Sequence, residues 1–299
     1  MALLPFDDRD GWIWLDGSLI PWREARLHVL SHGLHYASAV FEGERAYRGN
    51  IFRLRDHTNR FLNSARLLMF QIPYSAEQID AACLQVLEAN GLTDAYVRPV
   101  AWRGTEQLAV SPSGTTIHTA IAAWSWPSYF EGERMDGIRM MEGTWRRPSP
   151  ETAPTDAKAS ALYMIGSMNK LQAEQAGYAD ALLLDWRGYV AEATGANVFL
   201  VFDGELHTPL CEGFLNGLTR QSVISLARRA QMKVVERHIE HGELATATEV
   251  LVTGTAAEVT AVREIGPHRY TPGRITETLM KAFDDLVMRP PAEVDRICA

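Results

Sequence analysis

The feature that most restricts the possible folds of this 299-residue chain is a segment near its middle, residues 126–137. It is aromatic, contains glycine and follows neither a strand period nor a helix period. Segments of this kind commonly join compact domains. The chain is therefore expected to have a smaller N-terminal domain of residues 1–125, an interdomain loop of residues 126–137 and a larger C-terminal domain of residues 138–299.

Both parts are predicted to mix hairpins with helices. Residues 12–20 place an Asp-Gly pair between two apolar runs, which predicts a β-hairpin. Asp56 has the position of a helix N-cap. Ser75 and Gln78 form a capping-box pattern before a helix, whose inner face is predicted to comprise Ile79, Ala82, Cys83, Val86 and Leu87. This mixture favours an α+β or α/β architecture over a regular series of parallel βαβ units.

Composition excludes several classes of protein. A net charge of −8 argues against a general nucleic-acid-binding protein. The three cysteines (83, 211 and 298) are widely spaced and odd in number, which fits neither a disulfide framework nor a zinc site and favours a reducing compartment. The acidic N-terminus does not resemble a signal peptide, and no apolar run is long enough to span a membrane. A cytoplasmic protein without nucleic-acid or membrane partners is expected.

Common nucleotide and hydrolase motifs are missing from the sequence. It contains no P-loop, no Gly-x-Gly-x-x-Gly after a strand and no Gly-x-Ser-x-Gly elbow, which disfavours a kinase, a Rossmann dehydrogenase or an α/β-hydrolase. His28, His32 and His35 would share a face on a helix and could bind zinc. Gly33 weakens a helix there and no acidic partner is adjacent, so an ordered polar turn is favoured and no metal is expected.

Lys158 is unusual for this composition. The chain has four lysines and 25 arginines, and this lysine lies between Ala157 and Ala159, in a stretch of small residues. Lysine, unlike arginine, can lose its proton when buried and act as a nucleophilic amine. The simpler explanation is a solvated lysine near the start of a helix, and the stretch alone favours that explanation.

Other positions are suited to an anion or a cation. Gly217-Leu218-Thr219 lies where a predicted helix begins, and the first N–H groups and the dipole of that helix favour a phosphate. The loop of residues 253–257 offers hydroxyl and N–H groups, and Arg60 could bind a phosphate with two hydrogen bonds. Glu192, after a predicted strand, could pair with a protonated ring nitrogen. Each position also has an ordinary structural explanation, but together they match the needs of pyridoxal 5′-phosphate, including the lysine for a Schiff base.

The sequence resembles the branched-chain amino acid aminotransferases, in the class IV family of pyridoxal-phosphate enzymes, from Trp12 to about the last helix. The motifs that carry the resemblance are Ser31-His-Gly-Leu-His-Tyr36, Val40-Phe-Glu-Gly43, Phe52-Arg-Leu-Arg-Asp-His57 with Arg60, Tyr96-Val-Arg-Pro99, Pro154-Thr-Asp-Ala-Lys158, Glu192 to Asn197, Gly217-Leu-Thr-Arg220 and Thr253-Gly-Thr-Ala-Ala-Glu-Val259. The resemblance implies a two-domain fold of type IV, with a small α/β domain and a larger domain built as a pseudo-barrel of strands and helices.

The resemblance also implies site residues. Lys158 would carry the cofactor and act as the general base, and Glu192 would pair with the pyridine nitrogen. The other implied cofactor contacts are Arg60, Tyr163, Asn197, Leu218, Thr219 and Thr255. The N–H groups of Thr255 and Ala256 would bind the substrate carboxylate, and Arg98 would accept the second carboxylate of glutamate. The side-chain pocket would be lined by Phe41, Tyr129 and, from a partner subunit, Tyr36.

The implied activity is amino transfer between leucine, isoleucine or valine and 2-oxoglutarate, by a homodimer or a higher oligomer. The chain departs from the family pattern at Ser160-Ala161, at Ala196 and in the loop Gly104–Pro112, which leaves substrate preference open. An (R)-selective amine transaminase or a D-amino acid aminotransferase of the same fold is the alternative. A lyase acting on aminodeoxychorismate and a non-catalytic phosphate-binding protein are further alternatives.

Overall fold

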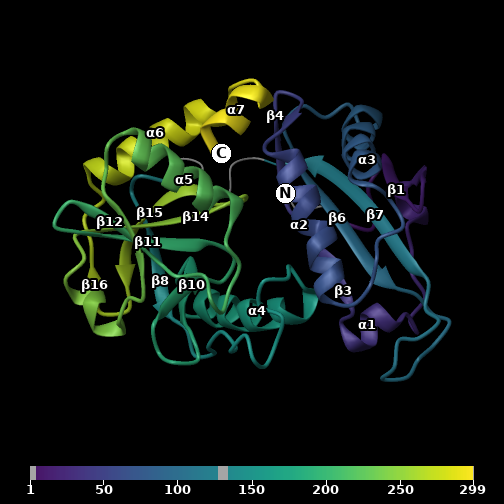
Figure 1. Cartoon of the computed structure of the whole chain (residues 1–299), viewed down its shortest axis with the longest axis horizontal. Helices are drawn as coiled ribbons and strands as arrows, with labels where there is room; N and C mark the ends of the chain where they lie inside the picture. Colours follow the sequence, from purple (N-terminus) through teal and green to yellow (C-terminus); the bar gives the residue numbers. More distant parts are fainter. Residues whose placement is uncertain (1–4, 127–133, 299) are drawn as a thin grey trace. The chain divides into compact units, whose positions relative to one another are not determined.

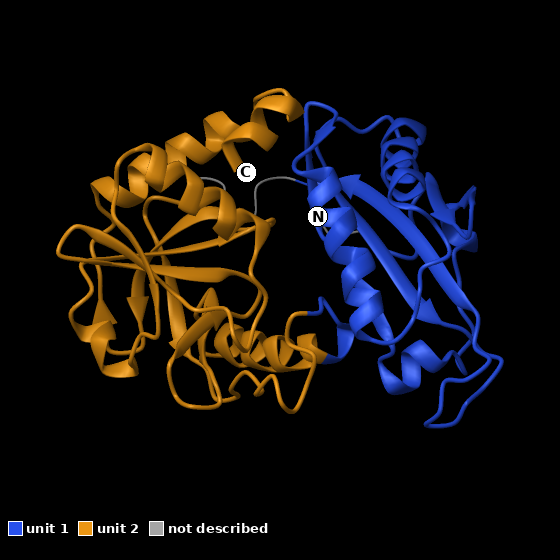
Figure 2. Ribbon diagram, viewed as in Figure 1, with its two compact units in different colours: residues 1–127, 157–161 blue, residues 128–156, 162–299 orange. Residues whose placement is uncertain are grey.

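A computed structural model describes residues 5–126 and 134–298 of the chain. The chain forms two compact units, coloured separately in Figure 2. Unit 1 comprises residues 1–127 together with 157–161, and unit 2 comprises residues 128–156 and 162–299. The segment 157–161, which contains Lys158, thus packs with the N-terminal unit, whereas the sequence-based division had assigned it to the C-terminal domain. Most of the expected interdomain loop, residues 127–133, lies outside the described residues.

Unit 1 is built on a seven-stranded sheet in the order β2-β1-β7-β6-β4-β5, with β3 also paired to β6 (Figure 1). The predicted Asp-Gly hairpin is confirmed: Asp16 and Gly17 have φ of 47° and 98°, the left-handed values that a tight hairpin turn requires. The strands are β1 (Trp12–Leu15), β2 (Ser18–Pro21), β3 (Ala39–Phe41), β4 (Glu44–Tyr47), β5 (Asn50–Ile51), β6 (Ala95–Arg103) and β7 (Ile117–Ser125).

Two helices cover one face of this sheet. The side chains of β6 alternate, so that Val97 and Ala101 join the core beneath α2 and α3 while Arg98 and Trp102 lie on the opposite face. The capping box of Ser75 and Gln78 is present, and all five residues predicted for the inner face of α3 are buried. The helical elements of the unit are η1 (Trp22–Glu24), α1 (His32–Tyr36), α2 (Leu54–Leu67) and α3 (Ala76–Ala89).

The N-cap predicted at Asp56 is wrong. Helix α2 begins two residues earlier, at Leu54, and Arg53 occupies the cap position with φ of 53°. Asp56 lies in the first turn, where its carboxylate accepts a hydrogen bond from Nε of Arg53 at 2.6 Å. The negative charge still lies at the positive end of the helix dipole, which explains the sequence preference without a capping role.

Unit 2 contains a closed barrel. Strands follow one another in the order β10-β9-β8-β15-β14-β11, and a β10–β11 pairing closes the ring. Valine, leucine and isoleucine side chains fill the interior, among them Val198, Val252 and Val262. The expected two-domain α+β fold with a barrel of strands is confirmed. The strands are β8 (Ile138–Glu142), β9 (Asp180–Leu184), β10 (Val190–Ala193), β11 (Asn197–Phe202), β12 (Glu205–Pro209), β13 (Val234–Arg237), β14 (Glu249–Gly254), β15 (Glu258–Ile265) and β16 (His268–Arg269).

The remaining helical elements belong to unit 2, and several of them pack against its strands. Helix α6 packs on β14 and β15, and α5 packs on β14 and against α6 and α7 (Figure 1). Within the described residues, none of the helices combines the length and the apolar character that crossing a membrane requires. The elements are α4 (Ser160–Gln175), α5 (Leu218–Arg229), η2 (His241–Ala245), α6 (Arg274–Val287) and α7 (Pro291–Cys298).

Candidate active site

The Lys158 backbone forms hydrogen bonds within unit 1 through both its N–H and its carbonyl. Its N–H donates to Oγ of the buried Ser64 on α2 at 3.0 Å, and its carbonyl accepts from the N–H of Phe41 at 3.1 Å. Ala159 forms a β-bridge with Val40. The lysine is half-buried, and Nζ lies 5.0 Å from the centre of the Phe41 ring. The lysine lies just before helix α4, and these contacts hold its backbone at a defined place.

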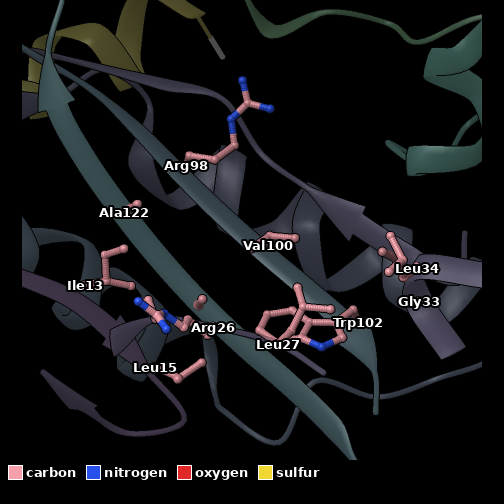
Figure 3. Close-up of a pocket in the computed structure, with 13 residues that line it drawn as sticks. Ile13, Leu15, Arg26, Leu27, Gly33, Leu34, Arg98, Val100, Trp102 and Ala122 are labelled. Carbon is pink, nitrogen blue, oxygen red and sulfur yellow. The ribbon is translucent and has the colours of Figure 1, made fainter. Parts of the chain in front are cut away.

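Phe41 also contacts a guanidinium. Cζ of Arg98 lies 4.8 Å from the centre of the same ring, and Nη2 of Arg98 donates to the Tyr96 hydroxyl at 3.2 Å. In Figure 3 the Arg98 guanidinium points away from the other labelled side chains of the apolar pocket on this face of the sheet. Its Nε is buried and lacks a hydrogen-bond partner within the described residues. A buried donor of this kind can receive a carboxylate.

Arg60 projects from α2 toward a buried glutamate. Nε and Nη2 of Arg60 donate to the two carboxylate oxygens of Glu42 at 2.7 and 2.8 Å. Nδ1 of His57, one turn earlier on the helix, lies 2.7 Å from Oε2 of the same carboxylate. Burial opposes ionisation of Glu42, but Arg60 and then His57 outweigh it and hold its pKa well below the ordinary value. Burial lowers the pKa of His57, so a neutral imidazole donates to an ionised carboxylate.

In unit 2, Glu192 forms an ion pair with an arginine. Its Oε1 lies 3.2 Å from Nε of Arg147, and both side chains are largely buried. Arg147 also donates to the carbonyls of Gly213 and Leu162, each at 3.3 Å, which fixes its position. Glu192 lies within β10 and pairs with Asn197 across the β10–β11 hairpin, so it does not follow the strand as predicted.

The N-terminus of α5 is held by Asn197. Its Oδ1 accepts from the N–H of Gly217 at 3.1 Å, and its Nδ2 donates to the carbonyl of Leu215 at 3.0 Å. Gly217 is the N-cap, as the sequence indicated, and Leu218 and Thr219 form the first turn. A Cβ on Gly217 would lie 2.3 Å from Oδ1 of Asn197, so a larger residue would displace the Asn197 side chain. The helix therefore presents its N-terminus from a position set by β11.

The β14–β15 turn joins these groups at one end of the barrel. Thr253 pairs with Asn197 across β14 and β11, and Thr255 and Ala256 follow in the turn. A Cβ on Gly254 would lie 3.2 Å from the carbonyl oxygen of Gly195, which shows how closely the two turns approach. Glu192, the α5 N-terminus and the Thr255–Ala256 turn thus share one end of unit 2.

Comparisons with known proteins identify the family of this chain. The family model described as amino-transferase class IV matches residues 39–265. The chain belongs to this family. This class IV aminotransferase is 44% identical over 289 residues to the branched-chain-amino-acid aminotransferase of Pseudomonas aeruginosa, with 94% of each chain covered. It is 36% identical over 282 residues to the corresponding protein of Escherichia coli K12, with 91% of each chain covered.

Solved structures resemble the aminotransferase over nearly its whole length. The T.th. branched-chain amino acid aminotransferase complexed with N-(5′-phosphopyridoxyl)-L-glutamate has a TM-score of 0.91 and 36% identity, covering 96% of this chain and 97% of that one. The branched-chain aminotransferase of Thermoproteus uzoniensis with norvaline has a TM-score of 0.89 and 37% identity, covering 93% and 95%.

The tyrosines predicted for the site lie in different elements of the aminotransferase. Tyr36 is exposed at the end of α1, and Tyr163 lies in the first turns of α4. Tyr129 lies outside the described residues. His32 contacts the Ser38 hydroxyl and the carbonyl of Ala109, which fastens the divergent loop Gly104–Pro112 to α1. In the part of the chain that the structure describes, no group of histidine, cysteine and carboxylate side chains could hold a metal ion.

Sequence reasoning did not assign roles to Glu42, His57 and Arg147. Glu42 and His57 lie inside quoted motifs, but nothing local shows that a glutamate in an apolar stretch will meet an arginine 18 positions later. Arg147 begins a proline-rich loop, and its partner Glu192 is far away in sequence. A charged residue inside a run predicted to be buried is the one available signal, because such a charge needs a partner.

The close contact at Gly217 yields a stability prediction. Gly217→Ala is expected to destabilise unit 2 by about 1–3 kcal/mol, because the added methyl overlaps Oδ1 of Asn197. The backbone φ of Gly217, −61°, suits alanine, so the overlap alone should act. Thermal unfolding measures the effect. Gly242→Ala, where no atom lies within 4 Å of the added methyl, is the matched control. The double variant with Asn197→Ala should recover stability relative to the additive sum, and strict additivity would contradict the mechanism.

Proposed function

We propose that the protein is a pyridoxal-phosphate-dependent aminotransferase that exchanges the amino group between branched-chain L-amino acids and 2-oxoglutarate. The observation that carries the proposal is that Lys158 and Arg98 both contact the ring of Phe41, in a chain that shares 44% identity with a branched-chain aminotransferase. An amine, an apolar ring and a guanidinium together suit a reaction that must accept both an aliphatic and an acidic side chain.

The residues present fit pyridoxal 5′-phosphate. When bound, this cofactor supplies the electron sink that stabilises negative charge on Cα of the substrate. Lys158 would hold it covalently, and Arg60, the first N–H groups of α5 and the Thr255 hydroxyl would hold its phosphate. Glu192, kept in place by Arg147, would hold a proton on the ring nitrogen. The close contact at Gly217 supports this fit, because the absence of a Cβ leaves room for Asn197 to hold the N-terminus of α5.

The chemical step is assigned to Lys158. Its free amine would remove the proton from Cα of the substrate and deliver a proton to the cofactor within the same half-reaction, and it would do the reverse in the second half. Tyr163 would contact the cofactor near this lysine. The N–H groups of Thr255 and Ala256 would orient the substrate carboxylate, and Phe41 with Tyr129 would contact the aliphatic side chain.

A substrate panel tests the proposed function. Transfer to 2-oxoglutarate is measured from L-leucine, L-isoleucine, L-valine, D-alanine and (R)-phenylethylamine, with product 2-oxo acid or ketone as the readout. The proposal predicts rapid transfer from the three branched-chain L-amino acids. Faster transfer from D-alanine or (R)-phenylethylamine would assign the protein to another activity of the same fold, and absence of transfer from all donors would reject transamination.

Arg98→Ala is expected to separate the two halves of the reaction. The variant should lose about 10- to 100-fold in kcat/KM for glutamate and 2-oxoglutarate, because a charged hydrogen bond to the second carboxylate is worth about 1.5–3 kcal/mol. Leucine has no such carboxylate and should lose much less. Single-turnover rates for each substrate check this. Arg66→Ala, on α2, is the control, and equal losses for leucine and glutamate would contradict the role.

We propose further that the active form is a homodimer or a higher oligomer. Helix α1 and the segment before it expose a cluster of large apolar side chains, a feature that often marks a protein–protein interface: Leu27, Val29, Leu30, Leu34 and Tyr36. Tyr36 would reach the site of the partner subunit. Analytical ultracentrifugation measures the oligomeric state directly, and a fully active monomer would reject the proposed oligomer.

A cytoplasmic location is also proposed, because the three free cysteines fit a reducing compartment.

A further inference from the structure

Glu42 is a fully buried carboxylate that four donors contact: Nε and Nη2 of Arg60, Nδ1 of His57 and, at 3.3 Å, the N–H of Gly43. Its segment lies between β3 and β4, and its own N–H donates to the carbonyl of Pro99 at 2.8 Å, which ties it to β6. The carboxylate accepts Nε and Nη2 of Arg60 and Nδ1 of His57, all within 2.8 Å. A Cβ on Gly43 would lie 2.0 Å from the Tyr96 hydroxyl, so the adjoining backbone is also closely packed. The carboxylate therefore has a rigid setting.

The pairing fixes the direction of the Arg60 guanidinium. Nε and Nη2 form the side-on edge of the group, and Glu42 occupies it. In a planar guanidinium this directs the end-on edge, made by Nη1 and the second N–H of Nη2, away from the carboxylate. Arginine has several rotatable bonds, and a bidentate partner removes that freedom before any ligand arrives.

The groups around Glu42 favour a single ion pair, the one between Glu42 and Arg60. Burial lowers the pKa of His57, so His57 contributes a hydrogen bond without a full charge. Two residues along the chain, Glu44 is also fully buried, but burial, and then the charges of Glu42 and Asp80, raise its pKa well above the ordinary value. Burial thus favours the neutral form of Glu44, whereas Arg60 and His57 favour the charged form of Glu42.

We infer that Glu42 is a positioning residue that holds Arg60 in the orientation needed to bind the phosphate of the cofactor. The inference deepens the proposed function and rests on it. A substitution that removes the negative charge of Glu42 has two opposite effects on phosphate affinity: it removes a repulsion, which strengthens binding, and it frees Arg60 to reorient, which weakens binding. The weakening should be the larger effect. The Arg60 side chain is only 14% exposed, and without its buried partner the guanidinium would turn toward solvent.

The test compares two ligands that differ in the phosphate alone. The full-length protein, freed of cofactor, is titrated with pyridoxal 5′-phosphate and with pyridoxal, and tryptophan fluorescence reports the dissociation constants. Glu42→Gln should weaken binding of the phosphorylated ligand at least about tenfold, the equivalent of one charge-assisted hydrogen bond, and leave pyridoxal nearly unchanged. Equal weakening for both ligands, or tighter binding of the phosphorylated ligand, would overturn the inference.

Glu44→Gln is the matched control, since it changes an equally buried glutamate whose burial favours the neutral form. It should leave the ratio of the two dissociation constants unchanged. Arg60→Ala should abolish the preference for the phosphorylated ligand, and adding Glu42→Gln to it should cause no further loss if Glu42 acts through Arg60. An additional loss in the double variant would refute that route.

Two further outcomes keep the test decisive. If Glu42→Gln does not fold, judged by thermal unfolding, Glu42→Asp retains the charge but withdraws the carboxylate by one methylene, and the same phosphate-specific loss is expected. An unchanged ratio in that variant would refute the inference. If the unaltered protein shows no preference for pyridoxal 5′-phosphate over pyridoxal, the assignment of Arg60 to phosphate binding fails and the inference with it. If it binds neither ligand, the proposed function itself fails.

Discussion

Lys158→Ala is expected to lower kcat/KM for L-leucine with 2-oxoglutarate by more than about 10⁴-fold, because the variant loses both the covalent attachment and the base that moves the Cα proton. The visible absorbance of lysine-linked pyridoxal should disappear at the same time. Both effects follow from the position of the lysine, whose backbone is fixed by Ser64 and Phe41. Steady-state rates and an absorbance spectrum of the purified variant measure them.

The matched control is another lysine of the same chain. Lys233 is 67% exposed and pairs with Glu205 on the surface, so Lys233→Ala should leave both the spectrum and the rates unchanged. Retention of transamination by Lys158→Ala would refute the assignment of the catalytic lysine. Loss of activity in both variants would point to a general effect of lysine removal on folding, which circular dichroism would detect.

The second large effect is expected at Glu192. Glu192→Gln keeps the size of the side chain but removes the negative charge, so the ring nitrogen of the cofactor would no longer be held in its protonated form. We expect a loss of about 10²–10³-fold in the rate of Cα proton removal, comparable to the removal of one preorganised electrostatic contact. Affinity for the phosphate should change little, because Arg60 and α5 are intact. Stopped-flow measurement of the half-reaction with L-leucine gives the rate.

Glu205→Gln provides the comparison for this substitution. Glu205, on β12, pairs with Lys233 at 2.8 Å and is partly exposed, so its replacement should not change the half-reaction. A Glu192→Gln variant with an unaltered rate would contradict the proposed pairing with the ring nitrogen. A variant that loses rate and cofactor affinity together would instead indicate that the ion pair with Arg147 supports the fold of this end of the barrel.

Local patterns predicted local structure well. The Asp16-Gly17 turn and the capping box of Ser75 and Gln78 were found where the sequence indicated, because each depends on residues within a few positions of one another. The start of α2 was misplaced for a related reason. An aspartate stabilises the first turn of a helix from several positions, so its presence predicts a helix start only to within a turn.

The candidate site was predicted as a set of residue types and not as a geometry. Lys158, Arg60 and Glu192 were each identified by the chemistry they could supply. Their partners, Glu42 and Arg147, were not, because an ion pair between residues distant in sequence leaves no periodic trace. The two-residue alternation of a strand shows which face a side chain lies on but not which distant side chain it meets there.

The sequence by itself determined the family and proposed Lys158 as the amine, because both depend on short motifs in a fixed order. Tertiary structure decided that the segment around Lys158 packs with the N-terminal unit, through a bridge between Val40 and Ala159. It also decided which ion pairs hold Arg60 and Glu192. The physical reason is that buried charges must find partners wherever the folded chain brings them, and only the packing of distant segments settles which partners those are.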